Sequence, residues 1–502
     1  MNNIQSPILL ADNSQLHILQ IVRILKGKRL VCRAVWCDQT VFAKLFFGEQ
    51  SAKYAARDAA GIGYLSQANI NTPKCLWQGK CLWQGQSQAN QGPNPQADVL
   101  IYEAIANAQN AEEIWPTLNL TQRLNLAKNL VVEVAKHHSA GLLQADLHLK
   151  NFLIADHIIY TLDGDGIRPL SRLFRKSQTQ RNLATLFSKM DVLDDDWMGK
   201  LYKTYCQHVG IAYSPFDEAE IWSLTQKIRR QTASDYADKK VFRQCTDITI
   251  LCKDSLRQNG FFKAISSDFL HHDFLQSFEQ INTYFIKENL LKNGSTCTVA
   301  LAQINNQKIV IKRYNIKSFW HGVSRALRQS RAAASWANTH RLKLLNIATA
   351  KPVALIEHRK YGLKGKTYFL TEYIDAPDAA QYFAQTQNKA QYKKQRAEVI
   401  KNIVTLFYKL CLLKISHGDM KATNIKIQGT QPVLIDLDSM RQHQWDYFAQ
   451  KSHVRDLQRF MQNWQNDNAL YNAFVKTFNV VYEDHTLLIR AGIATNKELM
   501  IE

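Results

Sequence analysis

The stretch HGDMKATNIKIQGTQPVLIDLDSM, residues 417–440, carries the spacing that decides the fold. In it, Asn424 follows Asp419 by five residues, and Asp436 follows that asparagine by twelve. An earlier stretch, QADLHLKNFLIADHIIYTLDGDG at residues 144–166, repeats this spacing with a second set of three residues: Asp146, Asn151 and Asp163. The chain therefore holds the same arrangement of landmarks twice, although the two stretches share few identical residues.

The residues upstream of each stretch also follow a common order. A short apolar strand with a single lysine comes about a hundred residues earlier, VFAKLF around Lys44 and IVIKRY around Lys312. A helix-like stretch, further strands and a long amphipathic helix then lead to each Asp-Asn loop. We therefore predict an α+β protein with two consecutive domains, residues 1–265 and 266–502.

Composition excludes several classes of protein. The chain has 502 residues, 46% hydrophobic and 21% charged, as expected for a folded chain rather than a disordered or fibrous one. Its formal net charge of +20 indicates an anionic partner, such as nucleic acid, an acidic membrane surface or a phosphorylated ligand. Because no nucleic-acid recognition motif is present, we expect no nucleic-acid partner.

The nine cysteines are odd in number and never form a CxxC pair, which favours a reducing compartment over a disulfide scaffold or a zinc ribbon. The first residues lack the basic start and apolar core of a signal peptide, and no apolar run approaches the roughly 18 residues that span a bilayer. We expect a cytoplasmic protein that can rest on a membrane surface.

A strand lysine, an Asp-x-x-x-x-Asn loop and a later aspartate are typical of protein-kinase-like phosphotransferases, which must place cations and metal ligands around phosphate oxygens. Lys44 and Lys312 are predicted to bind the nucleotide phosphates. Asp146 and Asp419 are predicted to orient and deprotonate the acceptor hydroxyl. Carboxylate and amide oxygens suit Mg²⁺, so a magnesium-binding role is predicted for four residues: Asn151, Asp163, Asn424 and Asp436.

The same pattern predicts where adenine would bind. An apolar strand in each half ends in an acidic residue, and the connector after it would pair its backbone groups with the base. The predicted connectors are Glu103-Ala104-Ile105 in the first half and Glu372-Tyr373-Ile374 in the second.

The two halves depart from the usual pattern in different ways. Neither contains a G-x-G-x-x-G run, so the loop backbone would hold phosphates less closely. The acid that steadies the strand lysine is predicted at Asp58 in the first half, where the second half has Ser335, which cannot neutralise a lysine. Two residues after the catalytic aspartate, the first half has His148, whereas the second has Lys421, which can neutralise the transferring phosphate.

The second half resembles a known family, the kinases that phosphorylate the inner-core sugars (Kdo or heptose) of bacterial lipopolysaccharide. Over most of residues 285–465, the resemblance is carried by Lys312-Arg313-Tyr314-Asn315, the Trp336, His340 and Leu342 pattern, HGDMKATNIKI, LIDLDSM and RDLQRFMQNW. The first half is similar more loosely, over roughly 25–190, through ADLHLKNFL and LDGDGIR. Together the halves resemble the tandem, two-domain members of this group.

The resemblance implies a kinase-like fold in each half, with a small antiparallel sheet lobe and a mainly helical lobe. It also implies ATP and Mg²⁺ as cofactors and a hydroxyl of the lipopolysaccharide core glycolipid as acceptor. We favour the second half as the catalytic one. The anionic membrane would attract the net positive charge, and the stretch KSFWHGVSRALRQSR at residues 317–331 is a candidate amphipathic helix for that surface.

Two other functions fit the sequence. A soluble small-molecule phosphotransferase of the aminoglycoside or choline type would share the same core and the histidine at position 148. A scaffold built from two non-catalytic kinase folds would keep the fold but bind no ATP or Mg²⁺.

Overall fold

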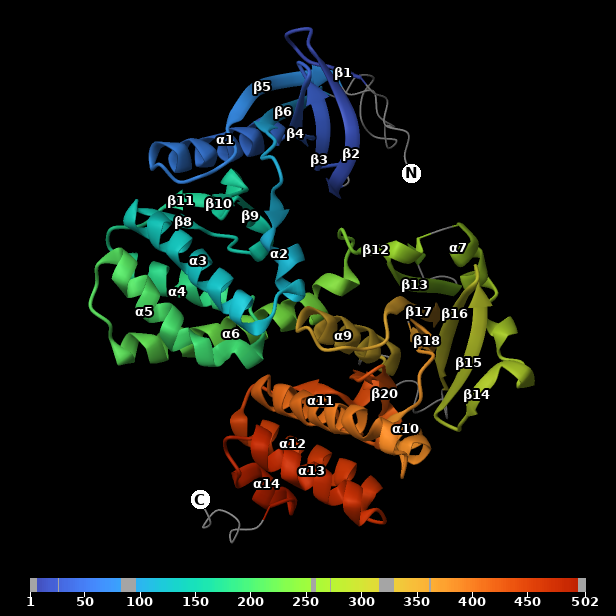
Figure 1. The fold of residues 1–502 in the computed structure, drawn as a ribbon. Helices are drawn as coiled ribbons and strands as arrows, with labels where there is room; N and C mark the ends of the chain where they lie inside the picture. Colours follow the sequence, from blue (N-terminus) through green and yellow to red (C-terminus); the bar gives the residue numbers. More distant parts are fainter. Residues whose placement is uncertain are drawn as a thin grey trace. The chain divides into compact units, whose positions relative to one another are not determined.

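The computed structural model describes residues 7–25, 27–82, 96–253, 259–270, 272–315, 329–360 and 363–494. It divides into two compact units, Met1–Arg229 and Arg230–Glu502, which we call unit 1 and unit 2 (Figure 1). Each unit combines an antiparallel sheet with a set of helices, which confirms the predicted α+β class. The candidate helix at 317–331 falls almost entirely outside the described residues.

Unit 1 begins with a six-stranded sheet whose strands run in the order β1-β2-β3-β4-β6-β5. All neighbouring strands are antiparallel. Helix α1 packs against strands β4 and β6 of the sheet. The elements are β1 (Ile8–Leu9), β2 (Gln15–Leu25), β3 (Arg29–Trp36), β4 (Gln39–Phe46), α1 (Ser51–Gln67), β5 (Cys75–Leu82) and β6 (Gln96–Glu103).

Alternation along β4 explains where Lys44 points. Val41, Ala43 and Leu45 are fully buried and belong to the core on one face of the sheet. Phe46 belongs instead to the cluster that packs on α1. Because residues two apart in a strand share a face, Lys44 lies on the α1 side.

The rest of unit 1 is mainly helical, and α3 packs along α5. An asparagine capping box starts α3, and two short hairpin-like pairs, β8 with β11 and β9 with β10, follow it. The elements are β7 (Gln109–Asn110), α2 (Ala111–Ile114), α3 (Leu120–Ser139), β8 (Leu142–Gln144), β9 (Phe152–Ala155), β10 (Ile158–Thr161), β11 (Ile167–Pro169), α4 (Arg175–Phe187), α5 (Met198–Val209) and α6 (Pro215–Asp238). The last residues of α6, from Arg230 on, belong to unit 2.

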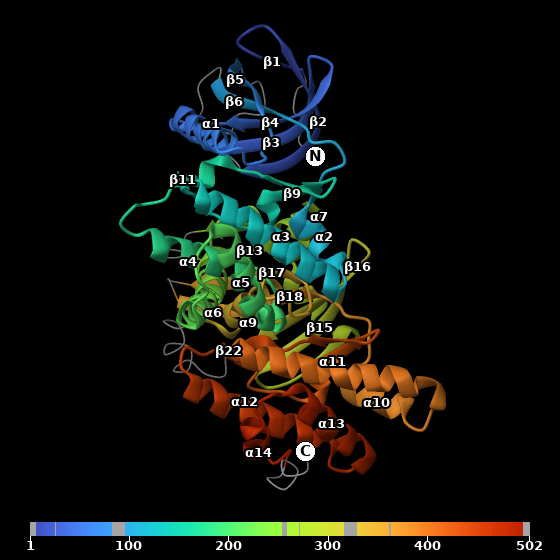
Figure 2. The same ribbon diagram turned by 60° about the vertical axis from the view of Figure 1, so that its left-hand side comes forward.

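Unit 2 has a seven-stranded sheet in the order β12-β13-β17-β18-β16-β15-β14, with α9 packed against it. Figure 2 shows α9 beside strands β17 and β18. The elements are β12 (Ile248–Lys253), β13 (Asn259–Ser266), α7 (His272–Glu279), β14 (Leu290–Asn293), β15 (Cys297–Ile304), β16 (Gln307–Tyr314), α9 (Arg331–Leu344), β17 (Pro352–Lys360) and β18 (Leu363–Glu372).

The structural division lies earlier than the boundary expected near residue 265. Strand β13 pairs with β17 from Asn259↔Lys360 to Ile265↔Ala354, and β12 pairs with β13. Residues 248–266 are therefore strands of the second sheet. The repeat itself does not contain these two strands, so counting between its landmarks gives a boundary later than the structural division.

The helical part of unit 2 is built on buried aromatic side chains. Phe407 packs on Phe460 and Phe478, and Phe474 packs on Phe460, with ring centroids 5.0–5.8 Å apart. The elements are α10 (Ala379–Thr386), α11 (Lys393–Leu412), β19 (Ile415–Ser416), β20 (Ile425–Gln428), β21 (Gln431–Leu434), β22 (Arg441–Gln442), α12 (Asp446–Met461), α13 (Asn468–Val481) and α14 (Thr486–Ala491).

Candidate active site

The strand lysine of unit 2 lies against two carboxylates. The Nζ of Lys312, on β16, forms an ion pair with Oδ1 of Asp436, and it lies 3.2 Å from Oδ2 of Asp438. Arg331, the first residue of α9, also contacts Asp438, at 2.6 Å. Burial alone would lower the pKa of Lys312, but neighbouring Tyr314 and the two carboxylates raise it above its usual value. The lysine is therefore held charged.

Asp436 adopts a left-handed backbone conformation, with φ of 62°. Its counterpart in unit 1, Asp163, has φ of 64°. Non-glycine residues rarely adopt this conformation, and such local strain is often found at functional sites. Burial tends to raise the pKa of each carboxyl, but the adjacent lysine outweighs it, and both pKa values lie below the usual value.

The loop of unit 2 surrounds Asp419 with two cations. Its Oδ2 lies 3.1 Å from Nζ of Lys421, and its Oδ1 lies 2.6 Å from Nη2 of Arg459 on α12. Partial burial tends to raise the pKa of Asp419, but these cations lower it below the usual value. Asp419 is therefore ionised at neutral pH, and both of its carboxylate oxygens can accept hydrogen bonds.

Asn424 shares the loop with Asp419. Its Nδ2 donates to the backbone oxygen of Asp419 at 2.8 Å. In unit 1, Nδ2 of Asn151 donates to the backbone oxygen of Asp146 at 2.7 Å. The amide oxygen of each asparagine is not used in this contact and can serve as a ligand.

Asp456, on α12, holds the start of the same loop by hydrogen bonds. Its buried carboxylate accepts from the backbone N–H of His417 at 2.6 Å and of Gly418 at 3.0 Å. Burial raises the pKa of this carboxyl to about 6, against the lowering effect of the two N–H groups. Gly418 has φ of 79°, and a Cβ there would lie 2.8 Å from the oxygen of Ser439, so only glycine fits without a shift.

Unit 1 holds its strand lysine differently. Nζ of Lys44 lies 2.7 Å from Oδ2 of Asp58 on α1 and 3.3 Å from Oδ1 of Asp163. Asp58 is completely buried and also accepts from the hydroxyl of Tyr102 at 2.5 Å. In unit 2, Ser335, the residue expected at this helix position, bonds to the hydroxyl of Tyr314 at 2.8 Å and leaves the lysine to Asp438.

The loop aspartate of unit 1 has fewer charged neighbours. Asp146 is exposed. His148, which takes the position of Lys421, lies with its Nδ1 3.7 Å from Oε1 of Glu112 rather than beside the loop aspartate, and this contact lowers the pKa of Glu112. Gln144 donates to the oxygen of Leu162 at 2.8 Å, as His417 contacts the oxygen of Ile435 at 3.0 Å in unit 2.

The predicted adenine connectors are partly engaged within the protein. The backbone N–H of Tyr373 donates to the oxygen of Lys308 at 2.9 Å, and that of Glu372 donates to the oxygen of Lys351 at 3.0 Å. The N–H of Glu103 donates to the oxygen of Lys74 at 3.0 Å. These three N–H groups already have partners within the protein. Pairing with adenine would therefore use other backbone groups of the connectors, including the N–H of Ile374.

Sequence reasoning did not assign roles to several residues of the cluster, namely Arg331, Asp438, Asp456 and Arg459. A signal existed for two of them. An aspartate stands two residues after the predicted metal aspartate in both halves, at 165 and 438. An Arg-x-Leu triplet also recurs, Arg181-Asn182-Leu183 in the first half and Arg455-Asp456-Leu457 in the second.

The residues fit Mg²⁺. Each unit brings an aspartate carboxylate and an asparagine whose amide nitrogen is turned to the loop backbone, so that oxygen donors remain for a hard cation. Asn424 and Asp436 would hold the ion in unit 2, and Asn151 and Asp163 would hold it in unit 1. A bound magnesium ion would supply positive charge to the phosphate oxygens.

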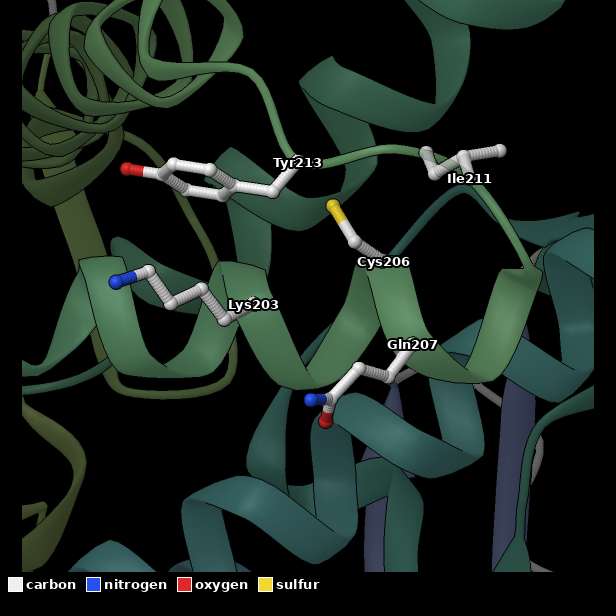
Figure 3. A pocket seen from close by; sticks show the side chains of 5 residues that line it. All are labelled: Lys203, Cys206, Gln207, Ile211 and Tyr213. Carbon is white, nitrogen blue, oxygen red and sulfur yellow. The ribbon is translucent and has the colours of Figure 1, made fainter.

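A cavity of about 280 Å³ lies elsewhere, at the end of α5 in unit 1 (Figure 3). Five residues line it: Lys203, Cys206, Gln207, Ile211 and Tyr213. Figure 3 shows the side chains of Lys203 and Tyr213 extending in the same direction, and the ammonium group lies 5.0 Å from the ring centroid. None of the predicted site residues lines this cavity.

A strand lysine, an Asp-Asn loop and a further aspartate beside a helical part define a candidate phosphotransferase site. Residues 287–481, less than half of the chain, match the model of the lipopolysaccharide kinase (Kdo/WaaP) family. The match lies entirely within unit 2.

The chain was also compared with individual curated proteins and solved structures. No curated protein matches the chain. Among solved structures, the chain is similar to one described as "WaaP in complex with acyl carrier protein", at 13% identity and a TM-score of 0.33, covering 45% of this chain and 93% of that one. Among the described residues, no helix is long and apolar enough to cross a membrane.

Proposed function

We propose that this chain uses ATP and Mg²⁺ to phosphorylate a sugar hydroxyl on the inner core of bacterial lipopolysaccharide. The family of residues 287–481 supports a lipopolysaccharide kinase. The observation that carries the proposal is the set of contacts around Asp419, which has Asn424 on its backbone and Lys421 and Arg459 on its carboxylate. This is the loop into which an acceptor hydroxyl would have to enter.

In this proposal, each residue of unit 2 has one task. Asp419 orients the acceptor hydroxyl and takes its proton, and its lowered pKa keeps it ionised for that purpose. Lys312, which lies beside Asp436 and Asp438, would bind the nucleotide phosphates. Lys421 neutralises the transferred phosphate. Asn424 and Asp436 hold magnesium, which supplies charge to the phosphate oxygens.

We propose that unit 1 is a second kinase-like domain that does not carry the main phosphoryl transfer. It keeps a lysine, a loop aspartate, an asparagine and a metal aspartate in the same relative contacts. Its loop aspartate, however, has His148 directed to Glu112 instead of a lysine on its own carboxylate. We therefore place phosphoryl transfer in unit 2.

The test is transfer of phosphate by the purified full chain from ATP to inner-core glycolipid, followed by mass spectrometry. We expect a product heavier by one HPO₃ group, formed only with a divalent cation present. Transfer to a soluble aminoglycoside or choline, with none to the glycolipid, would favour the small-molecule phosphotransferase. If ATP and Mg²⁺ cause no thermal shift, the scaffold function is favoured, because a ligand that binds the folded state raises its stability.

A further inference from the structure

Helix α12 of unit 2 starts with large apolar side chains that face solvent. Trp445, its N-cap residue, is 69% exposed, Tyr447 is 64% exposed and Phe448 is 56% exposed. The rings of Tyr447 and Phe448 pack on each other, with centroids 5.4 Å apart. Exposed aromatic residues gathered at one helix end mark a binding surface, because single exposed apolar residues are ordinary but clusters are not.

The same helix joins these aromatics to the candidate site. Phe448, Ser452, Arg455 and Arg459 stand at i, i+4, i+7 and i+11, so they form one stripe along the helix. Arg459 ends the stripe at 2.6 Å from Asp419. At 1.5 Å per residue, the stripe is about 16 Å long. The aromatic end therefore lies within the length of a few sugar units from the loop aspartate.

The charges on this face are mainly positive. Lys451, Arg455 and Arg459 are exposed on α12, and Arg441 is exposed just before it. The one exposed acid among residues 441–459, Asp446, is 2.5 Å from Nζ of Lys414. A face with tryptophan, tyrosine and phenylalanine beside a surplus of basic groups is complementary to an anionic lipid surface, where aromatic rings settle at the level of the headgroups.

Unit 1 repeats the feature at the equivalent place. Phe174 is the N-cap residue of α4, which follows β11 as α12 follows β22, and Figure 2 shows the protruding segment between β11 and α4. Leu173 is 89% exposed and Phe174 is 65% exposed, and exposed Arg168 and Arg172 precede them. The residues differ between units, but the combination of exposed apolar and basic side chains is the same.

We propose that the N-terminal end of α12 docks on an anionic bilayer, with Trp445 and Phe448 entering the headgroup layer. Arg455 and Arg459 then receive the acidic groups of a glycolipid acceptor on its way to Asp419, a step that rests on the proposed function. The bilayer contact itself does not depend on catalysis. It requires only the exposed aromatics and the basic groups beside them.

The test measures binding of the full chain to vesicles without nucleotide. Vesicles of phosphatidylglycerol and phosphatidylcholine are compared with vesicles of phosphatidylcholine alone. We expect binding to the anionic vesicles only, weakened by salt, and at least about tenfold weaker for Trp445→Ser/Phe448→Ser, since each exposed ring inserts only in part. Val480→Ser is the matched control, because Val480 on α13 is 78% exposed.

Three outcomes would overturn the proposal. Unchanged vesicle binding by the double variant would exclude α12 as the docking surface. Equal loss in the Val480→Ser control would show that any exposed apolar group suffices. If the wild type is a dimer, the double variant is a monomer and neither protein binds vesicles, a second copy of the chain covers this face. Unchanged thermal unfolding of the double variant verifies its fold.

A second readout separates this proposal from the proposed function. Transfer to glycolipid in vesicles is compared with transfer to the same core freed of its acyl chains. The double variant should lose transfer to the vesicle-bound acceptor by about the factor of its binding loss and keep transfer to the water-soluble one. Absence of transfer to both acceptors by the wild type, with vesicle binding still lost in the double variant, would refute the kinase function and leave the docking surface standing.

Discussion

The two units place the same four residue types in the same relative positions but neutralise the strand lysine with different acids. In unit 1, the acid is Asp58 on the helix that follows the lysine strand. In unit 2, that helix offers Ser335, and Asp438, two residues beyond the predicted metal aspartate, takes the role. The comparison shows that a charge can be conserved in space while its position in the chain changes.

The two loop aspartates also differ in the number of cations that contact them. The carboxylate of Asp419 contacts two cations, Lys421 and Arg459. Asp146 is exposed, and the residue two positions after it contacts Glu112 instead. The lysine pairs of both units are therefore largely buried, whereas the Asp-Asn loop of unit 2 is the more strongly charged one.

The largest effect is expected from removing the loop aspartates. Asp419→Asn should lower phosphate transfer by about 10²- to 10⁴-fold, because the acceptor hydroxyl loses its proton acceptor. Asp146→Asn is the matched variant and should leave transfer nearly unchanged. Both are measured as kcat with glycolipid acceptor, after circular dichroism shows that each protein is folded. Equal losses would mean that both units act, and a loss only in Asp146→Asn would move catalysis to unit 1.

A smaller effect is expected from the two acids that hold the lysines. Asp58→Asn and Asp438→Asn should each lower the free energy of unfolding of their unit by at most about 3 kcal/mol, since a buried lysine loses one of its two carboxylate partners. Urea unfolding measures the change. Ser335→Asp, which gives unit 2 the acid position of unit 1, should recover part of the loss in Asp438→Asn and nothing in Asp58→Asn. Failure of this rescue would contradict the exchange of roles between the two acids.

The smallest effect is a pH dependence at Asp456. Its folded pKa of about 6 lies above the usual aspartate value of 3.8, so between these values the unfolded chain loses the proton first. The free energy of unfolding of the wild type should therefore fall, relative to Asp456→Asn, as the pH rises from 4 to 7, by at most about 3 kcal/mol. A difference that does not change with pH would refute the raised pKa.

Unit 1 offers the reverse substitution as a control. Asn182 donates its Nδ2 to the backbone oxygen of Gln144 at 2.8 Å, whereas Asp456 accepts from backbone N–H groups. Asn182→Asp should destabilise unit 1 more at pH 7 than at pH 4, because an ionised carboxylate cannot donate. Equal destabilisation at both pH values would contradict this view of the two anchors.

Much of the candidate site could be predicted because its elements are close in sequence. Because only five residues separate the aspartate from the asparagine, the asparagine side chain can reach the backbone of the same loop. In both units its Nδ2 donates to the backbone oxygen of the aspartate. The strand lysine could be predicted from its place in an apolar run. The partner of Lys312 could not, because Asp438 is 126 residues away and only the packing of α9 decides which carboxylate reaches it.

The sequence by itself determined the α+β class, the repeated order of landmarks and the residue types that face the proposed phosphate site, because these follow from local periodicity and spacing. The tertiary structure decided where unit 2 begins, which acid neutralises each lysine, and that Asp456 and Arg459 hold the Asp419 loop. Those outcomes depend on contacts of about 3 Å between segments far apart in the chain, and spacing along the sequence does not encode such distances.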